Sequence, residues 1–392
     1  MRPADARWVR RAALALPWVA LVVALPAIEA LHNSFDLRVY AGATGAWLDG
    51  QGLYSFGLGD RRLGFTYPPS GGLLLLWTGA LPLGVVKVLQ HVLVVGAVLL
   101  AVRLLVARLD GLARYGPWTV SVVLTPMLFA LQPLRDTLSF GQVGSLVMLM
   151  VLVDLVLLGT GRRGAGVGVG LAAALKLTPA LFVVFYLAAG RRQAAATAVG
   201  VFVGATLLAA AVDPSTSWHY WTEVVVDPGH VGSVDSATNQ SLAGLVARLA
   251  NTHPDAPAGT TVLLALAAAL VVAAAARVAR RGDLVGGFAV TGLGTCLVSP
   301  ISWVHHLVWF VPALLWLADA GLRRRSRGLL GLVGLVVLAL LLDPPDRFRA
   351  VAGAHLDSWG TVLGENAYAV LLVLVAAVVA HVGSRRREVA LV

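Results

Sequence analysis

Four side chains of this sequence are placed where acid, base or anion-binding chemistry is possible. Asp36 follows the first long apolar run, and a carboxylate at the mouth of a membrane helix is costly to desolvate, so its presence predicts a function. Lys176 is one of only two lysines in 392 residues, and it interrupts an apolar stretch. His305 and His306 lie between two apolar runs. Together they supply a candidate general base and groups that can bind an anion.

Each of these residues also has a simpler interpretation. Asp36 could cap a helix through Val39 to Leu48. Lys176 could extend its ammonium to the membrane interface. We favour a base at Asp36, with its basicity raised by desolvation and restrained by nearby Arg38, and a phosphate contact at Lys176.

The histidine pair is not expected to hold a metal. Adjacent helical residues point about 100° apart, so we expect one ring, that of His305, to enter a cavity and the other to pack elsewhere. Two neighbouring histidines do not chelate one ion easily, and no nearby Asp-x-Asp adds oxygen ligands. The predicted role is a hydrogen bond to a phosphate or a sugar, and we expect neither metal nor cofactor.

Composition then sets the scaffold that must position these groups. Hydrophobic residues make up 58% of the chain and its mean hydropathy is +0.82, well above a soluble domain. Ala, Val, Leu and Gly dominate the apolar runs, which favours packed helices over membrane strands. The net charge of +10 has no nucleic-acid-binding motif beside it, and the single cysteine, Cys296, is expected to pack in the core.

The predicted fold is therefore one all-α domain, residues 1–392, with about 10 to 12 transmembrane helices. A span needs roughly 20 apolar residues. The expected spans are 12–31, 83–107, 117–132, 143–159, 193–212, 259–276, 284–300, 305–320, 328–342 and 366–383. Between Gly164 and Gly190, two shorter apolar pieces flanked by arginine pairs predict a helical hairpin broken near Lys176, incomplete in depth.

Charge distribution predicts the orientation. With a cytosolic N-terminus, most arginines fall at cytosolic ends, as the positive-inside rule requires. The long segments 32–69, 213–258 and 343–365, and most acidic residues, then face outward. Abundant Ala and Arg with scarce Lys are typical of a GC-rich bacterial genome. We therefore expect a multi-pass protein of the bacterial cytoplasmic membrane, with its site on the outer side.

Further polar and aromatic residues in the outward segments could converge on one pocket lined by aromatic rings, where amides bind sugar hydroxyls and rings stack on a sugar face. These candidates are Tyr67, Arg135, Asn239, Gln240, Arg248 and Trp303. Of these, Arg135 and Arg248 are further candidates for the phosphate, though Arg135 could instead pair with Asp136 or with Asp36. Asp154 is expected to form a structural ion pair with Arg162, about two turns away.

Taken together, these motifs resemble glycosyltransferase family 87, a group of GT-C-type mannosyltransferases that use polyprenyl phosphomannose. The motifs that carry the resemblance are FDLRVY at 35–40, FTYPP at 65–69, PLRDT with FGQ between 133 and 142, LKLTP at 175–179, TNQSLAGLVAR at 238–248 and SPISWVHH at 299–306. The resemblance implies a GT-C helical bundle whose outward loops and amphipathic helices form the site.

The same resemblance implies an inverting transfer of mannose from polyprenyl phosphate mannose to a glycolipid of phosphatidylinositol mannoside or lipomannan type, in an α-1,2 linkage. The expected partners are this donor, the acceptor and membrane lipids, and no nucleic acid. Two alternatives stay open at this point. One is a lipid-linked arabinofuranosyltransferase, and the other is a polytopic transporter, which the lack of an internal repeat disfavours.

Overall fold

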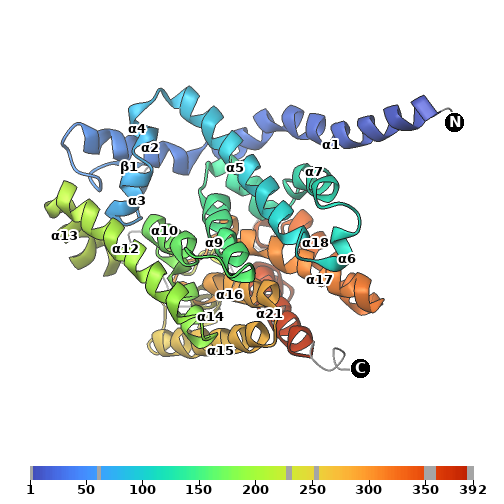
Figure 1. The fold of residues 1–392 in the computed structure, drawn as a ribbon. Helices are drawn as coiled ribbons and strands as arrows, with labels where there is room; N and C mark the ends of the chain where they lie inside the picture. Colours follow the sequence, from blue (N-terminus) through green and yellow to red (C-terminus); the bar gives the residue numbers. More distant parts are fainter. Residues whose placement is uncertain (1–2, 60–62, 227–231, 251–255, 348–358, 386–392) are drawn as a thin grey trace.

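The computed structural model describes residues 3–59, 63–226, 232–250, 256–347 and 359–385 (Figure 1). Within these ranges the chain is largely helical, and its one pair of strands is a small antiparallel hairpin of β1 (Gly57–Leu58) and β2 (Leu63–Gly64). The hairpin was not predicted. The all-α polytopic class expected from the sequence is confirmed.

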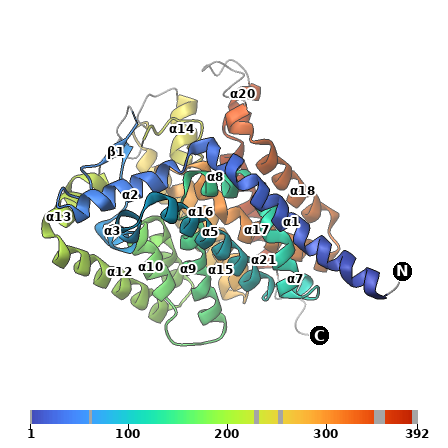
Figure 2. The same ribbon diagram turned by 90° about the horizontal axis from the view of Figure 1, so that it is seen from above.

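Six helices of the described residues are long and apolar enough to cross a bilayer. They are α1 (Pro3–His32), α5 (Leu83–Val106), α12 (Arg192–Val212), α15 (Thr260–Arg280), η4 (Val304–Trp309) continued by α17 (Phe310–Arg324), and α21 (Ala367–Ser384). Shorter apolar helices join them in the bundle. They are α9 (Gly144–Gly159), η1 (Thr178–Ala180) with α11 (Leu181–Ala188), α16 (Leu284–Val298) and α18 (Arg327–Leu342). In both ribbon views the N-terminal part of α1 projects beyond the bundle (Figure 2).

The span predicted at 117–132 is wrong in one respect. The chain forms α7 (Pro117–Leu128) and then turns by 72° into α8 (Gln132–Phe140), so the expected outward loop is a helix. Leu131 is extended at the corner, and Pro133 lies in the first turn of α8, where its missing N–H breaks no helical bond. The bend brings α8 into contact with α1, α2 and η4.

The segments predicted as long loops contain much helical structure. The remaining short elements are α2 (Phe35–Leu48), α3 (Pro69–Leu74), α4 (Trp77–Ala80), α6 (Asp110–Ala113), α10 (Val167–Leu175), α13 (Pro214–Thr222), η2 (Val224–Val226), α14 (Leu242–Ala250) and α20 (Trp359–Glu365). Several of them surround the cavity described below. Polar residues in these segments are therefore held by helices.

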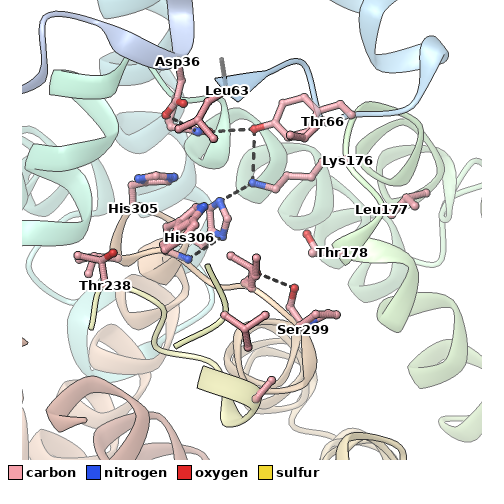
Figure 3. A pocket seen from close by; sticks show the side chains of 18 of the residues that line it. Asp36, Leu63, Thr66, Lys176, Leu177, Thr178, Thr238, Ser299, His305 and His306 are labelled. Carbon is pink, nitrogen blue, oxygen red and sulfur yellow. Dashed lines mark hydrogen bonds between the residues drawn. The ribbon is translucent and has the colours of Figure 1, made fainter. Parts of the chain in front are cut away.

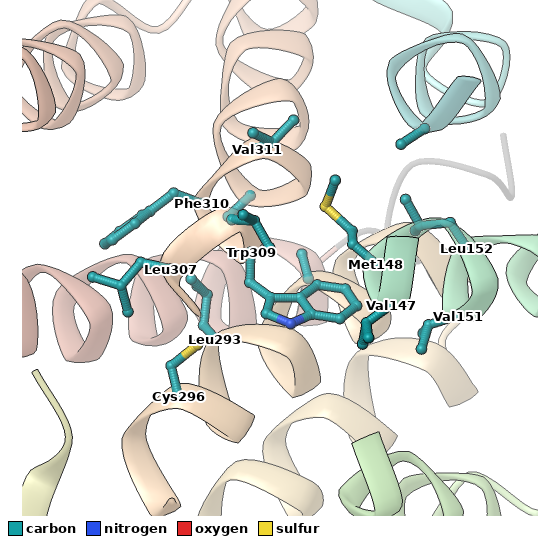
Figure 4. Packing of buried hydrophobic residues seen from close by; sticks show 14 of the residues in the cluster. Val147, Met148, Val151, Leu152, Leu293, Cys296, Leu307, Trp309, Phe310 and Val311 are labelled. Atoms are coloured by element: carbon teal, nitrogen blue, oxygen red, sulfur yellow. The ribbon is translucent and has the colours of Figure 1, made fainter. Parts of the chain in front are cut away.

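The core is densest around α16, which is buried along nearly its whole length. Figure 4 shows the ring of Trp309 among side chains of α9 and α16. A Cβ added at Gly292 would lie 2.1 Å from that ring, so the glycine permits the close approach. Cys296 is buried in this core, as expected. Outer faces such as Val92 and Leu270 stay exposed and apolar, which suits contact with lipid.

The broken hairpin between Gly164 and Gly190 is present as α10, η1 and α11. Nine residues of α10 rise only about 14 Å, too short to cross a core of about 30 Å. Lys176 is extended (φ −153°, ψ 127°) directly after α10, and Pro179 lies in η1. The break therefore ends inside the protein with Lys176 at its tip.

Asp154 does not form the predicted ion pair with Arg162. Its carboxylate accepts hydrogen bonds from the backbone N–H groups of Gly168 (3.1 Å) and Val169 (2.8 Å) and from the hydroxyl of Tyr186 (3.3 Å). The Arg162 side chain is exposed to solvent in the turn before α10. A buried carboxylate thus satisfies the free donors at the start of the helix that ends at Lys176.

Candidate active site

A cavity of about 790 Å³ opens among α2, α8, η1, η4 and the N-terminal end of α15. Its wall contains six of the residues predicted for the site. They are Asp36, Tyr67, Lys176, Trp303, His305 and His306. In Figure 3, Asp36 of α2, Lys176 after α10 and the two histidines of η4 approach one another, so the bends and breaks of the chain bring distant motifs together.

Asp36 is positioned by the sharp corner between α1 and α2. Asn33 and Ser34 adopt left-handed conformations there (φ 48° and 50°), and the Ser34 N–H donates to the Ser139 carbonyl oxygen of α8 (2.8 Å). Asp36 lies within the first turn of α2 after the N-cap residue Ser34, so the capping interpretation is wrong. Its Oδ2 accepts a hydrogen bond from Gln142 Nε2 (2.7 Å).

Burial raises the pKa of the Asp36 carboxyl to about 6, although the Gln142 hydrogen bond and the charge of Lys176 oppose the rise. The sequence suggested Arg38 as the nearby charge, but Lys176 has that role. A carboxylate with a pKa near 6 is ionised at neutral pH and still basic enough to take a proton. The position therefore suits a general base.

Gln142 connects the carboxylate to the rest of the wall. Its Oε1 accepts a hydrogen bond from the Tyr67 hydroxyl (3.1 Å), while its Nε2 donates one to Asp36. The oxygen and the nitrogen of the side-chain amide therefore each have a partner. The Tyr67 hydroxyl also lies 2.8 Å from that of Tyr40. Gln142 was noticed in the FGQ motif but was not named as a site residue, because nothing in the local sequence pairs it with Asp36. The Tyr67 hydroxyl therefore connects Gln142 with Tyr40, and stacking of its ring on a sugar stays a prediction.

Lys176 is drawn into the cavity and does not reach toward the interface. Its Nζ lies 2.7 Å from His306 Nε2 and 3.4 Å from the Tyr67 hydroxyl, and 5.1 Å from the centre of the Tyr67 ring. Burial lowers the pKa of the Lys176 ammonium to about 8, and the negative charge of Asp36 partly offsets this. The group is cationic near neutral pH and faces the same space as the base.

Both histidines line the cavity, so the expectation that only one ring enters it is wrong. The chain forms a 3-10 segment with non-helical geometry at Leu307, and the two rings lie 4.6 Å apart in an edge-to-face arrangement. His306 Nδ1 accepts from the Trp303 N–H (3.2 Å). His305 Nε2 is buried and has no hydrogen-bond partner. The two rings therefore have different surroundings.

The predicted sugar ligands Asn239 and Gln240 and the phosphate candidate Arg248 do not line the cavity, and their side chains stabilise the structure instead. Asn239 bonds the Val234 carbonyl oxygen (2.7 Å) and the Ser302 N–H (2.8 Å), and neither it nor Gln240 is exposed. The Gln240 amide bonds the carbonyl oxygen of Glu365 and the N–H of Ala369. Arg248 is buried against Asn366 and backbone carbonyl groups. The hydrogen-bonding groups of these side chains therefore connect α14 and the segment before it to their neighbours.

Arg135 lies beside the cavity rather than in its wall. Its Nη2 lies 3.4 Å from Asp343 Oδ2, and its Nε lies 3.7 Å from Asp136 Oδ1. The local pair with Asp136 was one of the two pairings considered, and the pairing with Asp36 does not occur. Among the described residues, no group of three or more His, Cys, Asp or Glu side chains could hold a metal ion.

Comparisons with known proteins agree with this arrangement. The model of glycosyltransferase family 87 matches residues 65–300, a range that excludes Asp36 and both histidines. A curated relative is the polyprenol-phosphate-mannose-dependent alpha-(1-2)-phosphatidylinositol pentamannoside mannosyltransferase of Mycobacterium tuberculosis. It is 34% identical over 80% of this chain and 72% of its own length. The protein of that name from Mycolicibacterium smegmatis is also 34% identical, over 80% of this chain and 76% of its own.

A further relative from Mycobacterium tuberculosis is named as a polyprenol-phosphate-mannose-dependent alpha-(1-2)-phosphatidylinositol mannoside mannosyltransferase. It is 32% identical over 77% of this chain and 75% of its own length. No solved structure gives a significant match. The match over residues 65–300, together with this identity along most of the chain, shows that the protein belongs to glycosyltransferase family 87.

Proposed function

We propose that this chain transfers mannose from a polyprenyl phosphate mannose donor to a phosphatidylinositol mannoside or lipomannan acceptor, forming an α-1,2 linkage with inversion. The names of the curated relatives support the donor, the linkage and the phosphatidylinositol mannoside class. The structural observation that carries the chemistry is one cavity that holds the Asp36 carboxylate and the Lys176 ammonium.

The reaction is a displacement at the anomeric carbon of the donor. The acceptor hydroxyl oxygen forms a bond to C1, and its proton passes to Asp36. The bond from C1 to the phosphate oxygen breaks, and its electron pair leaves with polyprenyl phosphate. Because Gln142 occupies Oδ2 of Asp36, the other oxygen, Oδ1, is available for the proton. One base on the acceptor side is sufficient for an inverting transfer.

Negative charge grows on the phosphate as the sugar leaves. The donor is a phosphodiester with one charge, whereas the product is a monoester with a second pKa of about 6. The Lys176 ammonium can meet this added charge, and His306, 2.7 Å from Lys176 Nζ, lies beside it. Interactions that strengthen as charge develops lower the barrier more than they improve binding.

We also propose that transfer needs no divalent cation and occurs on the outer face of the cytoplasmic membrane. Lys176 supplies a positive charge inside the cavity, which supports the first part. Activity should therefore persist in excess EDTA. A loss that added Mn²⁺ or Mg²⁺ restores would show that an ion takes part.

The direct test is a transfer assay with purified protein in nanodiscs. Radiolabelled polyprenyl phosphate mannose should label a phosphatidylinositol mannoside, whereas decaprenyl phosphate arabinose should not. Asp36→Asn keeps the shape but cannot accept the proton, so its turnover should fall by about 100-fold or more with an unchanged melting temperature. Turnover within about threefold of wild type would remove Asp36 from the base role, and arabinose transfer would support the arabinofuranosyltransferase alternative.

A further inference from the structure

The cavity has a second polar end whose charge is opposite to that of Lys176. Gln132 and Asp136 of α8 line it, together with Asp346 beyond α18, and we call these three residues the acidic end. Asp136 is only 6% exposed. Arg135 is shared between Asp136 and Asp343, so a single guanidinium faces two carboxylates. Burial raises the pKa of the Asp136 carboxyl to about 7, against the charge of Arg135, so the acidic end offers carboxylate oxygens and a negative charge that grows above neutral pH.

An unpartnered imidazole is part of the same wall. His305 is 6% exposed, and its Nε2 is buried without a hydrogen-bond partner. Its ring lies 5.0 Å from that of Phe140, which stacks on His32 at 3.7 Å, and all three residues line the cavity. A buried polar atom without a partner is costly. A hydroxyl of a bound ligand would give this nitrogen its missing hydrogen bond.

We propose that the acidic end, with His305, is the subsite for the terminal sugar of the acceptor, a proposal that rests on the transferase function proposed above. Sugar hydroxyls donate strong hydrogen bonds to carboxylates, and the sugar carries no charge to be repelled. A phosphate group would be repelled there and attracted to Lys176.

The position of the base, Asp36, agrees with an acceptor sugar at the acidic end and a donor phosphate at Lys176. Gln142, which bonds the Asp36 carboxylate, follows directly after α8, the helix that carries Asp136 and Gln132. An acceptor sugar held along α8 therefore has the base at one end of the same helix. The opposite charges of the two ends thus favour different substrates. The donor phosphate binds near Lys176, and the acceptor sugar binds near Asp136.

Steady-state transfer in nanodiscs tests this assignment, with a short-acyl phosphatidylinositol mannoside and a short-chain donor varied in turn. Asp136→Asn and Asp346→Asn should each raise the acceptor KM by roughly tenfold and leave the donor KM within about twofold. Lys176→Ala should raise the donor KM and leave the acceptor KM nearly unchanged. Asp49→Asn removes the same charge from the exposed end of α2, outside the cavity, and serves as the matched control. Asp346 is exposed, so its substitution does not threaten folding.

A binding measurement separates this proposal from the transferase function. A soluble α-mannobioside should raise the melting temperature of the wild type but not of Asp136→Asn, even if no donor is ever turned over. The subsite assignment fails if both aspartate variants alter the donor KM instead, or alter neither KM. It also fails if Ca²⁺ or Mn²⁺ alone stabilises the wild type and not Asp136→Asn, because the acidic end would then be a cation site.

Discussion

Two ionisable residues of the cavity have pKa values displaced toward each other. Burial raises the pKa of Asp36 to about 6 and lowers the pKa of Lys176 to about 8. A base must be deprotonated and a phosphate-binding ammonium must be protonated, so both groups are in their active forms only between these two values. Displaced values of this kind are typical of active sites.

The first prediction follows for the pH dependence of kcat/KM. Activity should fall below about pH 6, where Asp36 gains a proton, and above about pH 8, where Lys176 loses its proton. Lys176→Arg keeps its charge at high pH, so the alkaline limb should disappear in that variant whatever its absolute activity. An alkaline limb that persists unchanged in Lys176→Arg would assign that limb to another group.

The second prediction concerns the residues around the donor phosphate. Removing a charge that meets a phosphate in a partly dry site costs about 1.5–3 kcal/mol, so Lys176→Ala should lower kcat/KM for the donor by roughly tenfold or more. His306→Ala should act on the same parameter, because His306 contacts Lys176 directly. His305→Ala should act mainly on the acceptor KM. Normal transfer by both Lys176→Ala and His306→Ala would mean that the phosphate is held elsewhere.

At the scale of elements, much of the fold was predictable because a span needs a long apolar run, and such runs are visible in the sequence. The hairpin broken at Lys176 was recognised from its matching arginine flanks. The 72° turn between α7 and α8 was missed, because apolar residues continue through the corner up to Leu131. The composition of an apolar run predicts that a helix is buried and how long it is, but it does not predict where the chain turns.

The site was predicted in part, for a related reason. Asp36, Lys176 and both histidines were found because charged or titratable groups are rare in such a chain. Asn239 and Gln240 were assigned to sugar binding and Arg248 to the phosphate, but their side chains bond backbone groups of their own and neighbouring segments. Amides and guanidinium groups suit both tasks equally, and only the three-dimensional contacts decide between them.

The third prediction belongs to α10, whose first N–H groups are held by Asp154. Asp154→Asn replaces one acceptor oxygen with a donor and leaves a buried N–H unsatisfied, which costs about 1–3 kcal/mol. Its melting temperature should fall, and kcat should fall with it because α10 ends at Lys176. Arg162→Ala is the matched control and should change neither. Equal destabilisation by both variants would restore the ion pair predicted from the sequence.

At the scale of the whole molecule, the cavity joins a polar interior to an apolar wall. Apolar side chains, among them Val224 to Val226, Leu264 and Ile301, line it together with Lys176 and Asp36. A lipid-linked donor needs both surroundings at once, an apolar one for its chain and a cationic one for its phosphate. A cavity of about 790 Å³ has room for a sugar and its neighbouring phosphate.

The last prediction concerns which side of the membrane this cavity faces. Asp49 follows the last residue of α2, the helix that carries Asp36 in its first turn, and Arg162 lies in the turn before α10, one of the arginine-rich ends assigned to the cytosol. Cys296 is the only cysteine and is buried, so the natural chain gives a low labelling background. In intact cells, a membrane-impermeant maleimide should label Asp49→Cys and not Arg162→Cys, while permeabilised cells should label both. The opposite pattern would place the cavity, and the transfer reaction with it, on the cytosolic side.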